Sequence, residues 1–155
     1  MWKQQQFEHL FEHSSYIVER AFAQSKQHDA EQLFQSFVNV IASLSEQEQL
    51  QLLRAHPSLG ANIDMTNHSV QEQASAGLRA LTKEQYTLFS KMNIAYEERF
   101  GFPFIIAVKG KSVDTIYSVM ETRITNSYDE ERREALEQVL LIAKYRFEAV
   151  VGVSI

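Results

Sequence analysis

Apolar residues recur along most of this chain at spacings of three and four positions, which is the period of amphipathic helices. The longest such stretch begins near Asp129 and runs to Gly152, a residue type that commonly follows the last turn of a helix. The apolar positions of these stretches are Phe7, Leu10 and Phe11; Val18, Ala21 and Phe22; Leu33, Phe34, Phe37, Val38 and Ile41; Leu50, Leu52 and Leu53; Leu88, Met92, Ala95 and Tyr96; Ile116, Val119, Met120 and Ile124; and Leu136, Val139, Leu140, Ala143, Phe147 and Val150. The pattern predicts an all-α fold.

Helix-start signals divide these stretches into separate elements. The pairs Asp29–Gln32, Ser45–Glu48 and Thr82–Gln85 have the spacing of a capping box. Ser112 precedes another stretch, and Ser14 or Ser15 can cap the helix that carries Val18. The connections are short, and no linker or repeat interrupts them. We therefore predict a single-domain helical bundle of about seven to eight helices over residues 1–155.

One segment does not fit the helical period. Phe104–Val108 is a continuous apolar run directly after Pro103. It is short for a helix and has no evident strand partner, so we expect a short extended segment there. The main-chain groups of a buried extended segment need partners. They could cradle a ligand, or the run could instead be the buried first turn of a short helix.

A second break surrounds His56, in the sequence Ala55-His56-Pro57-Ser58-Leu59-Gly60. Proline disfavours the helical conformation of the preceding residue, so Pro57 ends a helix and holds His56 at its terminus. An unperturbed imidazole titrates near pH 6.5, which suits a general acid or base. The alternative is a structural histidine that interacts favourably with the C-terminal end of the helix dipole.

A third cluster brings together Ser69, Glu72 and Gln73. Ser69 and Glu72 have capping-box spacing, so both could serve only to begin a helix. In the functional interpretation, they face a cleft at a helix N-terminus, where donors and a carboxylate can hold a polar ligand. The Gln73 amide adds donors and an acceptor, and the three together could bind a heterocycle rich in N–H and C=O groups.

Composition narrows the classes of partner and compartment. The net charge is −5, which argues against nucleic acid, whose phosphates need clustered basic residues. The absence of cysteine excludes disulfides and thiolate chemistry and is compatible with a cytoplasmic protein. No apolar signal-peptide region follows Met1, and no run approaches the roughly 18 apolar residues of a membrane span. We therefore expect neither a nucleic-acid nor a membrane partner.

Other charged or imidazole side chains give weaker signals. His9 and His13 lie four positions apart, the spacing of two ligands on one helix face in some metal sites. Glu12 is adjacent, but no third ligand has suggestive spacing, so we predict no metal site. Lys109, Lys111 and Arg123 could attract an anionic substrate, although a solvated surface is the commoner explanation for each.

Taken together, these blocks resemble the 2-oxo-4-hydroxy-4-carboxy-5-ureidoimidazoline (OHCU) decarboxylase family. The matching stretches are Glu12–Tyr16, Ala55–Gly60, Ser69–Leu78, Asn93–Tyr96, Phe100–Gly110, and Arg123–Asn126 followed by Glu131. The His-Pro-x-Leu-Gly, Ser-x-x-Glu-Gln and Phe-Gly-Phe-Pro-Phe blocks are specific in this order and spacing. One departure is that the family often has Pro-Trp where this chain has Ser15-Tyr16, which bears on local packing or cleft shape.

The resemblance implies a cofactor-free decarboxylase that forms (S)-allantoin from OHCU in urate breakdown, a branch of purine catabolism. It implies an all-α fold that is often dimeric, and a small-molecule ureidoimidazoline as substrate. On this view His56 is the catalytic acid or base and Glu72 acts with it, either on the substrate hydroxyl or by fixing the imidazole. The implied substrate-binding residues are Pro57, Ser69 and Gln73 on one side, and the main chain of Phe104, Ile105, Ile106, Ala107 and Val108 on the other.

The chemistry suits residues of these types. Loss of carbon dioxide leaves electron density on a carbon beside an imine and a carbonyl, so the heterocycle is its own electron sink and needs no cofactor. The main alternative is a non-catalytic helical module that binds a small molecule or a partner helix, in which His56 and Glu72 would be dispensable. A metal-dependent hydrolase would need more ligands than the chain arranges.

Overall fold

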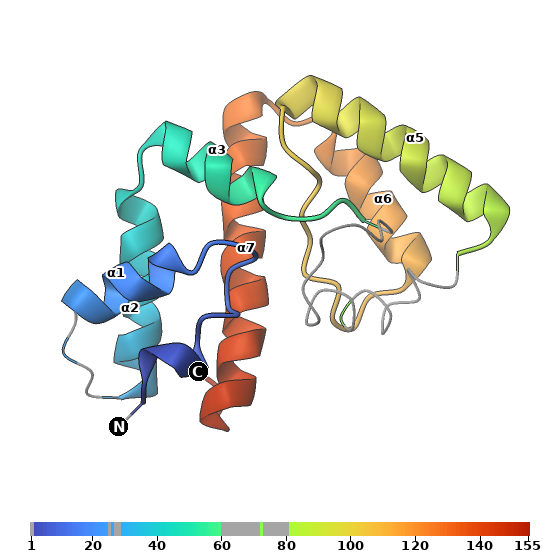
Figure 1. Cartoon of the computed structure of the whole chain (residues 1–155). Helices are drawn as coiled ribbons and strands as arrows, with labels where there is room; N and C mark the ends of the chain where they lie inside the picture. Colours follow the sequence, from blue (N-terminus) through green and yellow to red (C-terminus); the bar gives the residue numbers. More distant parts are fainter. Residues whose placement is uncertain (1, 25, 27–28, 60–71, 73–80) are drawn as a thin grey trace.

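The computed structural model of this chain describes residues 2–24, 26, 29–59, 72 and 81–155. Over this part the regular elements are helices, and no strand occurs (Figure 1). The elements are the 3-10 helix η1 (Gln4–Gln6) and the α-helices α1 (Tyr16–Gln24), α2 (Ala30–Ser43), α3 (Glu46–Arg54), α5 (Lys83–Phe100), α6 (Val113–Arg123) and α7 (Tyr128–Val151). The predicted all-α class is confirmed, and the predicted count of seven to eight helices is slightly high for the described residues. The helix expected to begin at Ser69 lies outside them.

Local capping chemistry begins most of these helices where the sequence predicts. The side chains of the predicted capping residues accept hydrogen bonds from main-chain N–H groups of the first turn at Asp29, Ser45, Thr82 and Ser112. α7 begins one residue before the predicted Asp129, because Ser127 and Glu130 form a capping box there. It ends at Gly152, whose φ of 77° places it in the left-handed region that favours glycine.

The predicted helical stripe of Phe7, Leu10 and Phe11 is wrong in its secondary structure and correct in its burial. These residues follow η1 in a series of turns, in which the N–H of Leu10 donates to the carbonyl of Phe7. His13 has a φ of 52°, which ends any helical continuation. All three apolar side chains are nevertheless buried, and the Phe7 ring stacks on Phe147 of α7 with centroids 5.3 Å apart.

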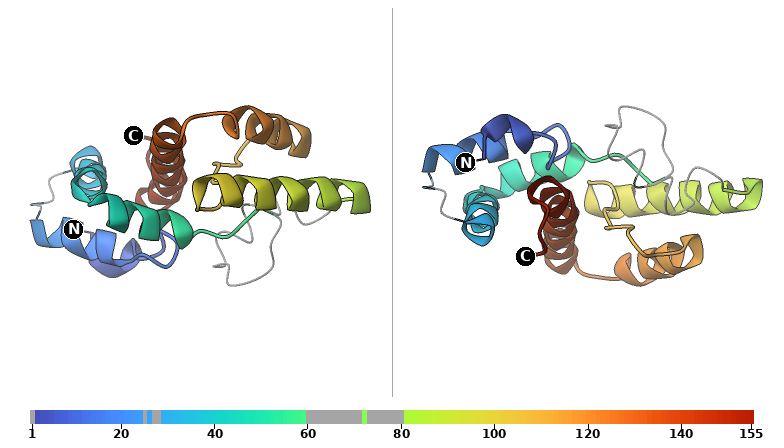
Figure 2. Two further views of the ribbon diagram at one scale, coloured as in Figure 1. Left: turned by 90° about the horizontal axis from the view of Figure 1, so that it is seen from above. Right: turned by 90° about the horizontal axis from the view of Figure 1, so that it is seen from below.

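α7 occupies the middle of the molecule. α1, α2 and α3 lie on one side of it, and α5 and α6 lie on the other, as the views from above and below also show (Figures 1 and 2). Helices α2, α3 and α5 each contact α7 directly. No helix in the described part of the chain is long and apolar enough to cross a membrane.

The predicted extended segment lies between α5 and α6. Residues 103–108 form neither helix nor strand, and they run as an extended trace that leads away from the end of α5 (Figure 1). The five side chains from Phe104 to Val108 are buried. α6 begins only at Val113, so the alternative of a buried first helical turn is wrong.

Candidate active site

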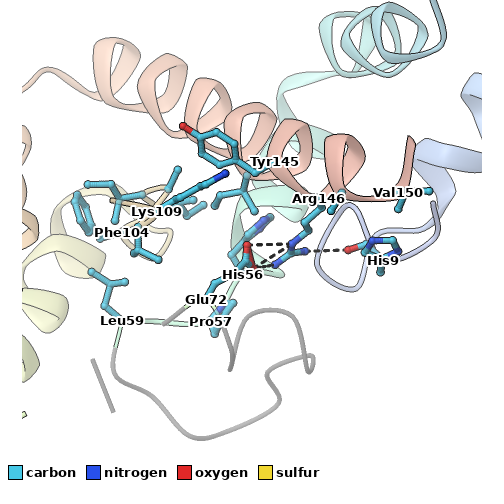
Figure 3. Close-up of a pocket in the computed structure, with 16 residues that line it drawn as sticks. His9, His56, Pro57, Leu59, Glu72, Phe104, Lys109, Tyr145, Arg146 and Val150 are labelled. Carbon is cyan, nitrogen blue, oxygen red and sulfur yellow. Dashed lines mark hydrogen bonds and ion pairs between the residues drawn. The ribbon is translucent and has the colours of Figure 1, made fainter. Parts of the chain in front are cut away.

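A cavity of about 530 Å³ opens between α7, the extended segment and the loop that follows α3 (Figure 3). Its size is within the range of small-molecule sites. Apolar side chains and main chain make up most of its wall, and a few polar groups converge at one part of it. The lining residues are His9, His56, Pro57, Leu59, Glu72, Phe104, Ile105, Ile106, Ala107, Val108, Lys109, Ile142, Tyr145, Arg146, Ala149 and Val150.

The loop that carries His56 is fastened to α5. The C-terminal turn of α3 closes with the His56 N–H donating to the carbonyl of Leu53 at 3.2 Å, and Pro57 follows directly. Beyond it, Ser58 Oγ donates to Glu97 Oε1 at 2.7 Å, and Asn93 Nδ2 donates to the carbonyl of Leu59 at 3.1 Å. These bonds hold the loop against α5, so the position of His56 is set from both sides of Pro57.

The protonation of the His56 ring follows from its surroundings. Its Nδ1 lies 2.9 Å from the carbonyl oxygen of Leu52, which can only accept, so Nδ1 carries the proton and Nε2 keeps its lone pair. Burial away from water lowers the pKa of His56 from 6.5 to about 4, and the charge of Arg146 acts in the same direction. The Leu52 carbonyl and the carboxylate of Glu12 raise this pKa without cancelling the effect of burial. At pH 7 the ring is therefore a neutral base.

Glu72 reaches the cavity as the partner of Arg146. The Arg146 guanidinium donates to the Glu72 carboxylate through Nη2 at 2.6 Å and through Nε at 3.1 Å, which is a two-point contact (Figure 3). Nη1 donates to the carbonyl of His9 at 2.9 Å and lies 3.7 Å from the buried carboxylate of Glu12. Arg146 thus joins two carboxylates and the N-terminal turns at one end of the cavity.

Arg146 is a site residue that the sequence analysis missed. It lies on α7 among the apolar positions Val139, Ala143, Phe147 and Val150, three and seven residues from Ala143 and Val139. Its side chain is only 6% exposed. A charged residue in a stripe that faces the core is rarely buried unless it is paired, and this signal was available in the sequence.

A buried ionic cluster, whose residues do not line the cavity, holds the extended segment in place. Arg123 of α6 donates to the carboxylate of Glu131 through Nη2 at 2.7 Å and to the carbonyl of Ile105 through Nη1 at 2.7 Å. Its guanidinium also covers the Phe104 ring, 4.3 Å from the centroid. Tyr96 donates a hydrogen bond to Glu131, and burial raises the pKa of its phenol. Arg123 is therefore a structural residue and not a surface cation that attracts substrate.

The structure brings together most of the predicted site residues. His56, Pro57, Glu72 and the whole Phe104–Val108 segment line one cavity, although they come from distant parts of the sequence. Ser69 and Gln73, and with them the capping-box alternative for Glu72, lie outside the described residues. Lys109 also lines the cavity, and its ammonium lies 4.6 Å from the centroid of the Tyr145 ring.

The spacing of His9 and His13 does not place them on a helix face, because residues 7–15 form turns and not a helix. His9 contributes to the cavity wall, and its carbonyl binds Arg146. Among the residues that the structure describes, no group of three or more His, Cys, Asp or Glu side chains could hold a metal ion.

Comparison with known proteins identifies the family. A family model described as OHCU decarboxylase matches residues 3–148. The chain belongs to the OHCU decarboxylase family. Two relatives named 2-oxo-4-hydroxy-4-carboxy-5-ureidoimidazoline decarboxylase are similar to this chain. The protein of Halalkalicoccus jeotgali is 43% identical over 90% of this chain and 79% of its own length, and that of Haloferax volcanii is 42% identical over 90% and 83%.

A solved structure supports the fold of this OHCU decarboxylase family member. A crystal structure of OHCU decarboxylase in the presence of (S)-allantoin superimposes with a TM-score of 0.80, covering 98% of this chain and all of the other. The two sequences are 17% identical, so this likeness shows the shared fold alone.

Proposed function

We propose that this chain catalyses the decarboxylation of OHCU to (S)-allantoin without a cofactor. The observation that carries the proposal is the neutral His56, whose Nε2 is available to act as a base in a cavity shared with the Glu72–Arg146 ion pair. Membership of the OHCU decarboxylase family supplies the substrate class.

The proposed reaction releases carbon dioxide and moves protons between the hydroxyl, the imine nitrogen and the ureido carbon. The ring carbon that carries the carboxylate in OHCU also carries the hydroxyl, and its neighbour carries the ureido group and the imine. When the bond to the carboxylate breaks, carbon dioxide leaves and the electron pair moves toward the imine nitrogen, which takes up a proton from water. The hydroxyl then loses its proton to become a carbonyl, and the ureido carbon gains a proton to give allantoin.

In this proposal, His56 carries the proton that moves from the hydroxyl to the ureido carbon. A neutral Nε2 accepts the hydroxyl proton, and the resulting imidazolium, which burial disfavours, returns it to the ureido carbon. The carbonyl of Leu52 fixes the orientation of the imidazole ring. The ring therefore delivers its proton to one face of the ureido carbon, which gives one enantiomer of allantoin. Glu72 binds Arg146 and not the imidazole among the described contacts, which supports a contact with the substrate hydroxyl over a role in fixing His56.

The rest of the cavity wall suits the departure of carbon dioxide. Ile142, Ala149 and Val150 present apolar surface, which favours a neutral product over a carboxylate. Lys109 at the cavity attracts the anionic substrate on its approach.

The test is turnover of freshly prepared OHCU, followed by circular dichroism so that (S)-allantoin is distinguished from the racemate formed spontaneously. The wild-type protein should accelerate decay and produce one enantiomer. His56→Asn should keep its helical spectrum and lose about 10²- to 10⁴-fold in rate. Decay no faster than in buffer would contradict the proposed function, and near-normal turnover by folded His56→Asn would remove His56 from the mechanism.

We also propose a cytoplasmic location, which the absence of cysteine supports, and fractionation of cells that express the protein would test it.

The homodimer implied by the family resemblance is supported by exposed apolar side chains on α5, including Tyr86 and Ile94. Sedimentation velocity should then give twice the mass of one chain.

A further inference from the structure

Side chains from outside the cavity hold one edge of the extended segment. The Ile105 carbonyl accepts from Arg123 Nη1 at 2.7 Å. The Ala107 N–H donates to Gln138 Oε1 of α7 at 2.9 Å, and the Ala107 carbonyl accepts from Lys111 Nζ at 2.9 Å. The carbonyl of Ile105 and both the N–H and the carbonyl of Ala107 are therefore hydrogen-bonded, each to a side chain.

This alternation determines where the intervening residue points. In an extended chain, the N–H and C=O of one residue share a side, and those of the next residue point to the opposite side. Because the bound edge comprises Ile105 and Ala107, the N–H and C=O of Ile106 point away from Gln138 and Arg123. No hydrogen bond to either group occurs within the described part of the chain, and Ile106 lines the cavity.

The side chains of this edge are themselves fixed. The Gln138 amide uses its nitrogen to donate to Glu134 Oε1 at 3.1 Å, which leaves its oxygen aimed at Ala107. Arg123 is only 6% exposed and is bound by the carboxylate of Glu131, which also accepts from Asn126 Nδ2 at 3.1 Å. A main chain held in this way is preorganised, so a ligand does not bear the cost of ordering it.

We propose that Gln138, Lys111 and Arg123 are positioning residues that present the N–H and C=O of Ile106 to the ring amide of the substrate. The inference rests on the proposed function for the class of ligand, a cyclic ureide. Such a ring carries N–H and C=O side by side, so it can exchange two hydrogen bonds with one residue, as neighbouring antiparallel strands do. The peptide of Ile106 thereby orients the ring relative to His56.

The first test replaces Gln138 by methionine, which has a similar length and cannot accept the Ala107 N–H. Hydantoin, a cyclic ureide with no leaving group, serves as the probe in titration calorimetry, and OHCU serves in turnover assays. We expect Gln138→Met to bind hydantoin about tenfold more weakly and to raise the KM for OHCU by a similar factor, with a smaller effect on kcat. The amide resonance of Ile106 should shift on hydantoin binding in the wild type.

Matched variants separate positioning from general destabilisation. Gln35→Met makes the same change on α2, where it breaks the side-chain hydrogen bond from Gln35 to Asn39, four residues on. It should leave hydantoin binding and KM unchanged. The double variant Glu134→Gln with Gln138→Glu exchanges the two side-chain types, restores an acceptor for Ala107, and should recover most of the affinity. Lys111→Met gives an independent loss at the Ala107 carbonyl and should also weaken hydantoin binding.

Each outcome bears on the proposal. Normal hydantoin affinity and KM in folded Gln138→Met and Lys111→Met would overturn it, as would a wild-type protein that fails to bind hydantoin. A double variant that stays as weak as Gln138→Met would show that the lost acceptor is not the cause. Hydantoin binding that depends on Gln138, in a protein that does not accelerate OHCU decay, would support the positioning role while the proposed reaction fails.

Discussion

His56 is the residue through which pH should act most directly on the folded protein. Burial lowers its pKa to about 4, whereas in the unfolded chain the imidazole has its ordinary value of about 6.5. Between these two values the unfolded chain binds a proton that the folded chain does not, so the free energy of unfolding falls as pH falls from about 6.5 toward about 4. The difference between the two pKa values corresponds to a loss of roughly 3 kcal/mol over this window.

Urea denaturation of the wild type and of His56→Asn, from about pH 7.5 to about pH 4, measures this loss. The Asn side chain does not titrate, and its amide N–H can replace Nδ1 in the bond to the Leu52 carbonyl. Carboxylates titrate in both proteins, so the difference between the two curves reports His56. We expect the wild type to lose roughly 3 kcal/mol more than the variant on acidification. Parallel curves would refute the lowered pKa and with it the assignment of His56 as a neutral base.

Three further predictions follow from the same cavity. Glu72→Gln should melt within a few degrees of the wild type and lose at least about tenfold in kcat/KM, or about 1.4 kcal/mol of transition-state binding; early melting with normal kcat/KM would make Glu72 structural. Arg146→Met should cost about 3 kcal/mol in urea denaturation, because it removes the guanidinium from buried Glu12. The same change at the exposed Arg20–Glu48 pair should cost less than about 1 kcal/mol, and equal costs would contradict this account of Arg146. Exhaustive chelation should leave OHCU turnover unchanged, and loss on EDTA treatment with rescue by a metal ion would contradict cofactor-free catalysis.

Helix boundaries in this chain are predictable because capping is local. Ser45 and Glu48 are three residues apart, and the bonds that they make involve only their own turn. Pro57 and Pro103 mark the two non-helical parts of the cavity for a similar reason, since each restricts the residue before it. The candidate site could thus be outlined from residues whose effects reach only a few positions along the chain.

What the sequence does not indicate depends on contacts between distant residues. The stripe of Phe7, Leu10 and Phe11 has helical spacing, yet these residues form turns, because burial against α7 and the positive φ of His13 decide their conformation. The position of Arg146 in an apolar stripe indicates that it is paired, but not with which groups: its partners are the carbonyl of His9 and Glu72, which lies 74 positions away. The bond between Gln138 and Ala107 likewise spans 31 positions, and no local motif signals it.

The contact of the first turns with the last helix has a consequence for synthesis on the ribosome. The Arg146 bond to His9 joins residues 137 positions apart, and the stack of Phe7 on Phe147 joins a similarly distant pair. Closing so long a loop is entropically costly and slow compared with helix formation. Phe7 can pack against Phe22 and Phe37 of the early helices, but it contacts Phe147 only after α7 has been made. His9, which lines the cavity, gains its bond to Arg146 late, so the cavity becomes complete only after α7 has emerged from the ribosome.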